Sequence, residues 1–457
     1  MRIHRVRGLA ALATVASLAS LSTLAACSSS DDKSADGKVT ITVEGWRPGD
    51  EQATIDTVKK QAQLFMDDHP DIIVKPVEWQ WTAETFATQL AGNTLPTTFR
   101  VPFTDTKGLA ERQQIADVTD LVNALPYAAD FNPSVLDAVK GTDGKIYGLP
   151  SDVYGVGLHY NRDLFEQAGL DPDSPPTTWD EVRADAKQIA DQTGQAGYVQ
   201  MSVNNTGGWM LTTLTYALGG RMESVDGTEA TIDNPGTAQG LQMLHDMRWT
   251  DDSMGKNTGY EWTPINEAFA AGKIGMYMSG SDVYNALTTT NQIDPAQYGL
   301  AALPLADNAE AGILGGGSVN AVSAKATPEE QAAAVQWADF YRVQKLYNED
   351  AAVLDAKTLV AADQPVGTPT LPVFDEATYQ KTQQWIAPYV NVPLDQMSSF
   401  VDRIFSQQLI PEPASHTQEV YGLLDSVVQK VLTDENADIA SLLSDADSQA
   451  QQLLDAS

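Results

Sequence analysis

Histidines are few and scattered, which limits the metal-dependent and acid–base chemistry open to this chain. The five are His4, His69, His159, His245 and His416, and no two have the spacing of a metal-binding pair. Neither a G-x-S-x-G nucleophile motif nor a D-x-D-x-D-G calcium loop is present, and the glycines at 315–317 lack the lysine of a phosphate loop. Paired carboxylates are uninformative among 61 acidic residues. We therefore expect a binding protein and not an enzyme, with no metal and no cofactor.

Aromatic residues stand where predicted strands and turns end. A core aromatic belongs to a periodic apolar stripe, whereas these four lie beside turn-forming residues: Trp46, Tyr154, Trp209 and Trp262. Binding residues concentrate on such loops, although any single ring is equally consistent with core packing. Taken together, the four rings favour a site that stacks aromatic side chains on a ligand.

Alternating strand and helix patterns surround these candidate residues. Apolar and polar residues alternate over 39–46, helical spacing follows over 55–65, and 72–74 begins a second strand. A Thr three residues before a Glu, at 178–181 and again at 327–330, predicts a capping box at the start of a helix. The order indicates an α/β fold with a mainly parallel sheet. The last third of the chain, from Leu346, is predicted to be helical with proline breaks.

Cys27 is the only cysteine, and the residues before it indicate export. Three arginines within the first seven residues precede an uncharged stretch over 8–26, which is typical of a secretory signal. The sequence at 24–28, Leu-Ala-Ala-Cys-Ser, resembles the bacterial lipobox. We expect a signal peptide at 1–26, lipidation of Cys27 and a flexible tether at 27–38, so that acyl chains hold the protein at the outer face of the cell membrane.

The overall charge excludes several classes of partner. The chain carries 28 basic and 61 acidic residues, for a formal net charge of −33. Such a charge repels nucleic acid and anionic lipid surfaces, so we expect contact with the membrane only through the lipid anchor.

Three ordered motif groups carry a family resemblance. The first runs from Gly-Lys-Ile-Tyr-Gly-Leu-Pro at 144–150 through 158–170 to Thr-Trp-Asp-Glu-Val at 178–182. The second is Phe-Ala-Ala-Gly-Lys-Ile-Gly-Met at 269–276, and the third joins Tyr-Gly-Leu-Ala-Ala-Leu-Pro at 298–304 to the glycines at 315–317. In this order the motifs are similar to those of extracellular solute-binding proteins of ABC importers, in the sugar-binding family that includes maltodextrin-binding protein. The resemblance covers roughly residues 39–341.

The resemblance implies a two-lobed periplasmic-binding-protein-like fold. Each lobe is expected to hold a mainly parallel sheet flanked by helices, with lobe one at 39–152 plus 301–347 and lobe two at 153–300 plus 348–457. A ligand in the cleft between the lobes stabilises the closed form, which membrane permease subunits recognise. The protein is then a monomer that captures a carbohydrate, most simply an oligosaccharide.

The same resemblance, together with the loop aromatics, assigns candidate ligand-binding residues. Asp282 occupies a place where relatives often carry an aromatic, and Pro-Thr-Thr-Phe at 96–99 replaces the family's P-D-V element. Gly316 and Ser318 are expected to offer backbone donors, and Arg403 a contact from the C-terminal helices. The full set is Trp46, Arg47, Asp105, Tyr154, Trp209, Trp262, Asp282, Gly316, Ser318 and Arg403.

Two other functions remain open from the sequence. A binding protein for a polyol, an amino sugar or a polyamine suits the acidic composition, because aromatic rings can surround a cation. Convergence of Asp105, Asp152 and Asp282 on one pocket would favour that ligand. A surface glycoside hydrolase or adhesin could use the same lipid anchor, and the hydrolase would need two close carboxylates at a fixed separation.

Overall fold

The structure is a computed structural model that describes residues 37–50, 52–224, 227–413 and 415–456. Cys27 and the predicted signal peptide lie outside the described residues, so the predicted lipidation stays a prediction. Within the described residues, no helix combines the length and apolar character needed to cross a membrane.

The N-terminal strands form the parallel part of the sheet. Strand β1 (Val39–Trp46) pairs in parallel with β2 (Ile72–Glu78) and with β3 (Thr98–Pro102). Helices α1 (Gln52–Asp68) and α2 (Ala83–Gly92) connect these strands, as the alternating pattern predicts. Ile41 and Val43 of β1 are fully buried against Phe65 of α1, because alternate strand residues face the same side of a sheet.

One long strand joins the two halves of the molecule. The first part of β4 (Gly148–Asn161), up to Gly155, pairs antiparallel with β8 (Ile313–Val322). From Val156 onward β4 pairs antiparallel with β6 (Ile274–Gly280) and β7 (Tyr298–Ala301). With β5 at Ala196–Tyr198, the strand order is β2-β1-β3-β8-β4-β6-β5. The expectation of a mainly parallel sheet thus needs correction, because every pair made by β4 is antiparallel and the sheet is mixed.

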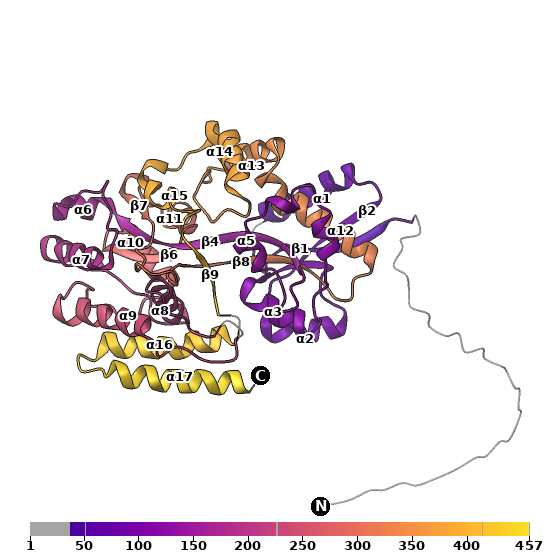
Figure 1. Cartoon of the computed structure of the whole chain (residues 1–457). Coiled ribbons are helices and arrows are strands. Elements are labelled where there is room, and N and C mark those ends of the chain that lie inside the picture. The colour runs from indigo at the N-terminus through magenta and orange to yellow at the C-terminus, as the bar shows by residue number, and fades with distance from the viewer. Residues whose placement is uncertain (1–36, 51, 225–226, 414, 457) are drawn as a thin grey trace, which may run out of the picture.

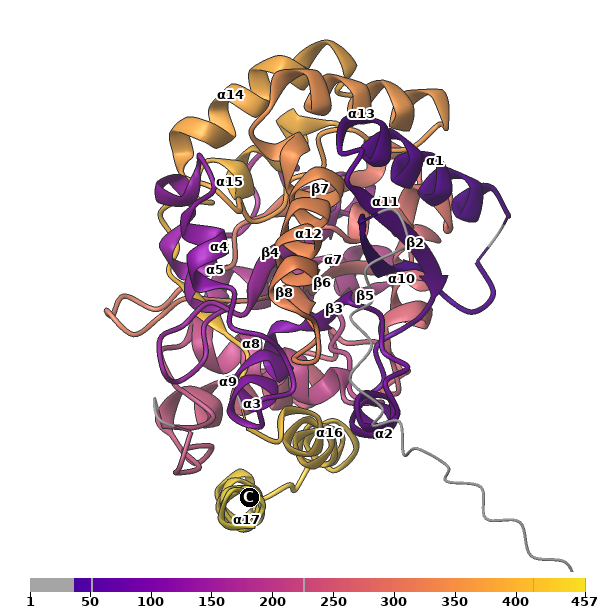
Figure 2. The ribbon, with the colours of Figure 1, turned by 90° about the vertical axis from the view of Figure 1, so that its right-hand side faces the viewer.

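Helices cover the sheet at both ends of β4 (Figure 1). One end carries α1, α2 and α12, and the other carries α6, α7, α8 and α9 (Figure 1). Figure 2 shows the first end facing the viewer, with α12 in front of the strands. The α/β two-lobed fold is therefore confirmed. The remaining helices before the last third are α3 (Phe103–Glu111), α4 (Thr119–Asn123), α5 (Pro133–Asp137), α6 (Arg162–Ala168), α7 (Trp179–Thr193), α8 (Thr206–Ala217), α9 (Pro235–His245), α10 (Trp262–Ala270), α11 (Val283–Thr289) and α12 (Pro328–Ala338), with β5 at Ala196–Tyr198.

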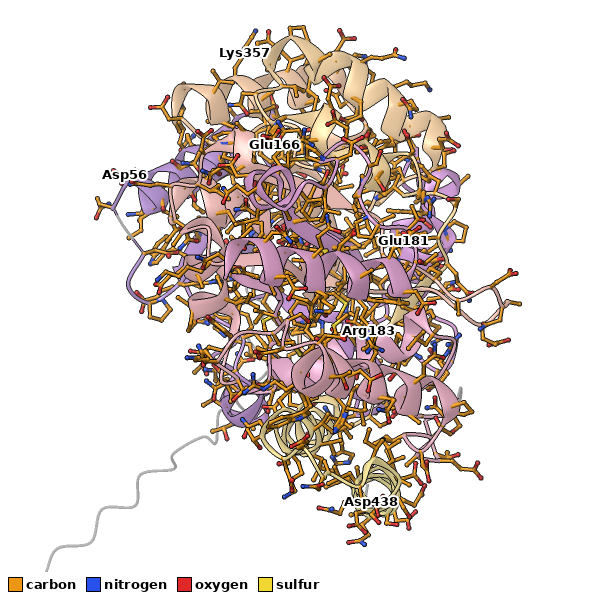
Figure 3. All side chains as sticks on the ribbon, turned by 90° about the vertical axis from the view of Figure 1, so that its left-hand side faces the viewer. Asp56, Glu166, Glu181, Arg183, Lys357 and Asp438 are labelled. Carbon is orange, nitrogen blue, oxygen red and sulfur yellow. The ribbon has the colours of Figure 1, made fainter. Side chains whose placement is uncertain are left out.

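Both predicted capping boxes form. The Thr178 side chain accepts from the backbone N–H of Glu181 at 3.2 Å, and the Glu181 carboxylate accepts from the N–H of Thr178 at 3.1 Å. Thr327 and Glu330 repeat the arrangement at the start of α12. Later in α7, Arg183 forms ion pairs with Asp246 at 2.7 Å and with Asp251 at 2.5 Å. Figure 3 shows Arg183 on the left-hand side of the view in Figure 1.

The last third is helical, as predicted. Its elements are α13 (Glu349–Ala361), α14 (Glu376–Ile386), α15 (Ser398–Val401), α16 (Thr417–Thr433) and α17 (Ile439–Asp455), with the short strand β9 (Leu409–Pro411) beside β8. Helices α13 and α14 lie on one side of β4, whereas α16 and α17 lie on the other (Figure 1).

A buried histidine stands at the centre of the β4–β6–β7 region. The Nε2 of His159 lies 3.1 Å from the carbonyl oxygen of Ser279 and its Nδ1 lies 2.8 Å from the Tyr298 hydroxyl. Because a carbonyl only accepts, Nε2 carries the proton and Tyr298 donates to Nδ1. Burial lowers the pKa of His159 from 6.5 to about 4, so the ring is neutral in the folded protein.

This histidine predicts a pH dependence of stability. The unfolded chain takes up a proton at His159 below pH 6.5 and the folded protein only near 4, so folding stability falls as the pH drops through this window. The loss is at most about 3 kcal/mol. We expect His159→Gln to remove this part of the slope, as measured by urea unfolding at pH 7 and pH 4.5. An unchanged slope in the variant would contradict the assignment.

Candidate functional site

Two of the sequence-predicted aromatic residues meet beside β4. The ring centroids of Tyr154 and Trp209 lie 6.2 Å apart, and the ring planes are nearly perpendicular at 89°. Both side chains are half-buried and pack against the main core. The indole Nε1 of Trp209 is buried and has no hydrogen-bond partner among the described residues, so it is a free donor at this position.

The C-terminal helix α16 holds Trp209 in place. The carboxylate of Asp425 in α16 accepts from the backbone N–H of Asn205 at 2.7 Å and of Gly208 at 2.8 Å, which caps the start of α8. A Cβ on Gly208 would come within 2.3 Å of the backbone oxygen of Tyr421. This close contact requires glycine at 208 and fixes the turn of α8 that carries Trp209.

Gly316 has a steric role that the sequence did not indicate. A Cβ at this position would lie 2.4 Å from the Tyr154 hydroxyl, so only glycine leaves room for that ring. The strands pair Gly316 with Tyr154 and Ser318 with Ser151. The predicted role of Gly316 and Ser318 as backbone donors to a ligand stays a prediction.

Glu412 lies within electrostatic range of Tyr154, Asp105 within range of Glu412, and Glu419 within range of Asp105. Asp105 lies in the first turn of α3, Glu412 follows β9 and Glu419 lies in the first turn of α16. Glu412 accepts from the Tyr421 hydroxyl at 3.0 Å, and burial together with the charge of Asp105 raises its pKa to about 7. Burial also raises the pKa of Asp105, the hydrogen bond from Thr104 and the charge of Arg112 oppose this rise, and the charge of Glu419 adds to it. These groups favour a bound cation or shared protons.

Tyr154 connects the rings to the carboxylates. Burial raises the pKa of its hydroxyl, and the charges of Glu412 and Asp282 raise it further. Sequence reasoning found Asp105 and Tyr154 but missed Glu412 and Glu419. The local signal for Glu412 is its place between Pro411 and Pro413, a few residues before α16.

Four predicted residues lie apart from this group. Trp46 ends β1 half-buried, with the ammonium of Lys59 5.4 Å from its ring centroid, and Arg47 beside it is exposed. Trp262 is 42% exposed at the start of α10, and Arg403 is exposed in the turn after α15. Among the described residues, no ring contact, hydrogen bond or ion pair joins these four to Tyr154 or Trp209.

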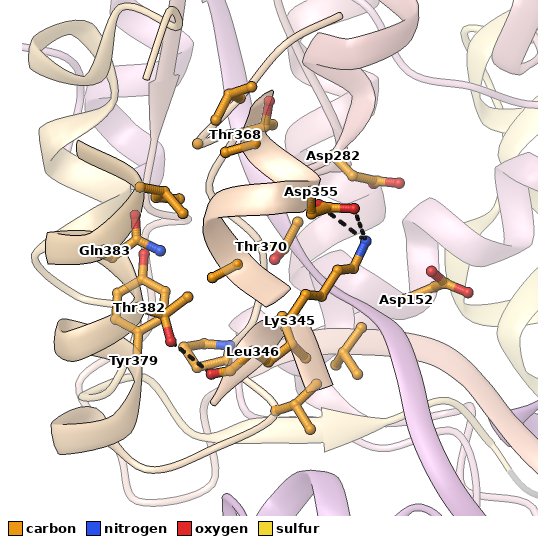
Figure 4. A pocket seen from close by; sticks show the side chains of 18 of the residues that line it. Asp152, Asp282, Lys345, Leu346, Asp355, Thr368, Thr370, Tyr379, Thr382 and Gln383 are labelled. Atoms are coloured by element: carbon orange, nitrogen blue, oxygen red, sulfur yellow. Dashed lines mark hydrogen bonds and ion pairs between the residues drawn. The ribbon is translucent and has the colours of Figure 1, made fainter. Parts of the chain in front are cut away.

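A cavity of about 400 Å³ lies on the other face of β4. Adjacent residues of a strand face opposite sides of the sheet. Tyr154 faces Gly316 and Trp209, whereas a Cβ on Gly155 would point at Leu371 in the cavity wall, 3.0 Å from its Cγ. Asp152 and Asp282 line the cavity and Asp105 does not. The convergence of three aspartates that would have favoured a cationic ligand is therefore absent from this cavity. Figure 4 shows Asp152 and Asp282 on one side of it.

No group of three or more metal-ligating side chains gathers among residues 37–50, 52–224, 227–413 and 415–456. The arrangement beside Tyr154 therefore offers aromatic faces, a free indole donor and carboxylate acceptors.

Comparison with curated proteins finds partial relatives. A Brucella abortus binding protein is 29% identical over 190 residues, which are 40% of this chain and 43% of that protein. The sn-glycerol-3-phosphate-binding periplasmic protein UgpB of Yersinia pestis is 31% identical over 136 residues, 27% of this chain and 30% of that protein. The chain thus matches less than half the length of either relative.

Solved structures share the fold over nearly the whole chain. The cyclic α-maltosyl-1,6-maltose binding protein of Arthrobacter globiformis superposes with a TM-score of 0.71 at 22% identity, covering 92% of this chain and all of that one. UgpB of Mycobacterium tuberculosis, in complex with glycerophosphocholine, gives 0.69 at 18% identity, covering 92% and 99%. The family model for bacterial extracellular solute-binding proteins matches residues 60–359. The chain belongs to the family of bacterial extracellular solute-binding proteins.

Proposed function

We propose that this protein is the substrate-binding subunit of an ABC importer and that it captures a carbohydrate, most simply an oligosaccharide, between its two lobes. Lobe one is formed by 39–152 plus 301–347 and lobe two by 153–300 plus 348–457. The protein acts as a monomer, tethered through lipidated Cys27 at the outer face of the cell membrane. It delivers its ligand to permease subunits there, and the tether keeps its local concentration high.

The Tyr154–Trp209 pair beside carboxylates is the observation that carries the carbohydrate assignment. A sugar presents apolar C–H faces and a belt of hydroxyl groups, so its site needs flat rings and polar acceptors together. Asp105 and Glu412 supply acceptors for hydroxyl groups, and the free Nε1 of Trp209 supplies a donor to a sugar oxygen. The membership of the chain in a solute-binding family supports binding as the function of this group.

The charge around Tyr154 bears on the ligand class. Some relatives are named for sn-glycerol-3-phosphate or were solved with glycerophosphocholine, both of which contain a phosphate. Three carboxylates, Asp105, Glu412 and Glu419, oppose a phosphate at this position through like-charge repulsion. The same carboxylates make an amino sugar or polyamine the second candidate, because they attract a cation and the rings can surround it.

Isothermal titration calorimetry with three ligand sets tests this assignment. Neutral oligosaccharides are expected to bind, glycerol 3-phosphate is expected to bind at least tenfold more weakly, and amino sugars mark the second candidate if they bind more tightly than neutral sugars. Binding of glycerol 3-phosphate alone would overturn the carbohydrate proposal. Turnover of a chromogenic glycoside would instead identify a hydrolase.

The first site prediction concerns the stacked rings. Trp209→Ala removes a large apolar face from the ligand and is expected to weaken sugar binding roughly tenfold to a hundredfold, from about 1.5–3 kcal/mol of lost burial. The matched control is Trp262→Ala, which removes an exposed tryptophan from α10 of the same half of the molecule. Equal losses in the two variants, measured by calorimetry, would argue against a site at Trp209.

The second site prediction concerns pH. The pKa of Glu412 is raised to about 7, so the side chain gains a proton as the pH falls through neutrality. The protonated carboxyl group then no longer accepts hydrogen bonds at both oxygens as the carboxylate does. Affinity for a neutral sugar is expected to fall between pH 8 and pH 6 in the native protein and to change little in Glu412→Gln. Titrations at four pH values in this range provide the comparison. An identical pH profile in both proteins would exclude Glu412 from the site.

The third prediction concerns the anchor. Cys27→Ala is expected to release the protein into the medium or periplasm and to reduce uptake, while the affinity of the purified protein stays unchanged, because the anchor lies far along the chain from the binding residues. Fractionation, uptake assays and calorimetry check the three parts. A loss of affinity in solution would contradict the tether role.

A further inference from the structure

The cavity behind β4 lies on the face of the strand opposite the Tyr154 ring, and it shares Asp282 at its edge with the surroundings of Tyr154. Its volume of about 400 Å³ is within the range of small-molecule sites. Its walls come from Ser151–Val153 of β4, from 342–346, from α13 and α14 and from the segment 366–374. Figure 4 places Tyr379, Thr382 and Gln383 of α14 across the cavity from Asp152 and Asp282.

Arg342 is the unusual group in this wall. The cavity is lined by Arg342, whose side chain is half-buried, and burial lowers its pKa. The guanidinium stacks on the Tyr341 ring, 4.6 Å from its centroid. Asp152 and Glu44 attract it through space, but no oxygen of the described residues accepts a hydrogen bond from it. A guanidinium has five N–H donors, so those of Arg342 are open to an acceptor that enters the cavity.

Most of the neighbouring charges are paired with each other, whereas Asp282 at the edge makes no ion pair with the described residues. Arg100 donates to Glu44 and to Asp152, both at 2.8 Å. Lys345 donates to Asp355 at 3.3 Å, as Figure 4 shows. Arg342 is therefore the one cation of this cavity wall that lacks a hydrogen-bonded anion in the described part of the chain. A planar carboxylate matches the fork of a guanidinium with two parallel bonds.

The other walls define the rest of the ligand. Apolar side chains from the turn before α13, from α13, from α14 and from the 366–374 segment line the cavity: Leu346, Leu359, Val366, Leu371, Phe374 and Ile386. They would bury a hydrocarbon body. Asp152 and Asp282 at the edge disfavour a second negative charge on the ligand, which argues for one carboxylate and against a phosphate dianion.

We propose that this cavity binds a small monocarboxylate, with its carboxylate on Arg342 and its apolar body between α13 and α14. The site is separate from the rings at Tyr154, which face the opposite side of β4. Because β4 connects the two halves of the molecule, an occupant of the cavity contacts the connecting strand directly.

Hexanoate and its neutral amide, hexanamide, form the test pair. Saturation-transfer NMR titrations on the full mature protein are expected to show hexanoate binding at least tenfold more tightly than hexanamide. Arg342→Gln is expected to abolish this difference. The matched control is Lys357→Gln, which removes an exposed cation from the outer face of α13 and is expected to keep it. Equal binding of the two probes, or a retained difference in Arg342→Gln, would overturn the proposal.

A second variant leaves the charges untouched. Ala356→Leu on α13 adds three carbons to the cavity wall and is expected to weaken hexanoate binding at least tenfold. Thermal unfolding of each variant confirms that it folds. Unchanged hexanoate affinity in a folded Ala356→Leu protein would place the probe elsewhere and refute the cavity as its site.

Discussion

The sharing of β4 between two sets of strand partners is the constraint on which the other features of this protein depend. One continuous strand pairs with β8 in its first part and with β6 and β7 in its second. The register shifts between Ser151 and Tyr154, and Asp152 adopts a left-handed conformation with φ of 51°. Such a conformation is costly for a non-glycine residue, and the Arg100–Asp152 ion pair offsets part of that cost.

The alternation of side chains along this strand separates two chemically different environments. Tyr154 faces α8 and α16, where rings and carboxylates gather, whereas the next residue, Gly155, faces Leu371 and the cavity. Gly155 of β4 and Gly315 and Gly316 of β8 carry no side chain, so neighbouring side chains can approach the backbone on both faces of the sheet. A shift of register by one residue would exchange the two environments, which is why the irregular step at Ser151–Tyr154 matters.

The strong negative charge of the chain has a local counterpart beside Tyr154. Asp105 lies in α3, Glu412 in the segment after β9, and Glu419 in α16. Burial raises the pKa of Asp105 and of Glu412, and the charge of a neighbouring carboxylate adds to each rise. Behind β4, by contrast, Arg100 and Lys345 form ion pairs with neighbouring carboxylates, whereas Arg342 and Asp282 form none with the described residues. Net charge alone distinguishes neither environment, since it is a sum over the whole surface.

Much of the architecture could be predicted from local sequence. Periodicity and capping residues identified β1, α1 and the starts of α7 and α12, because propensity and N-terminal hydrogen bonds act within a few residues. The motif order identified the family, and the loop aromatics identified Tyr154 and Trp209 as candidates. Only the tertiary structure decided that these two rings meet while Trp46 and Trp262 lie apart, that Glu412 joins Asp105, and that β4 pairs only antiparallel. Contacts between residues hundreds of positions apart depend on strand pairing and helix docking, which leave no local pattern in the sequence.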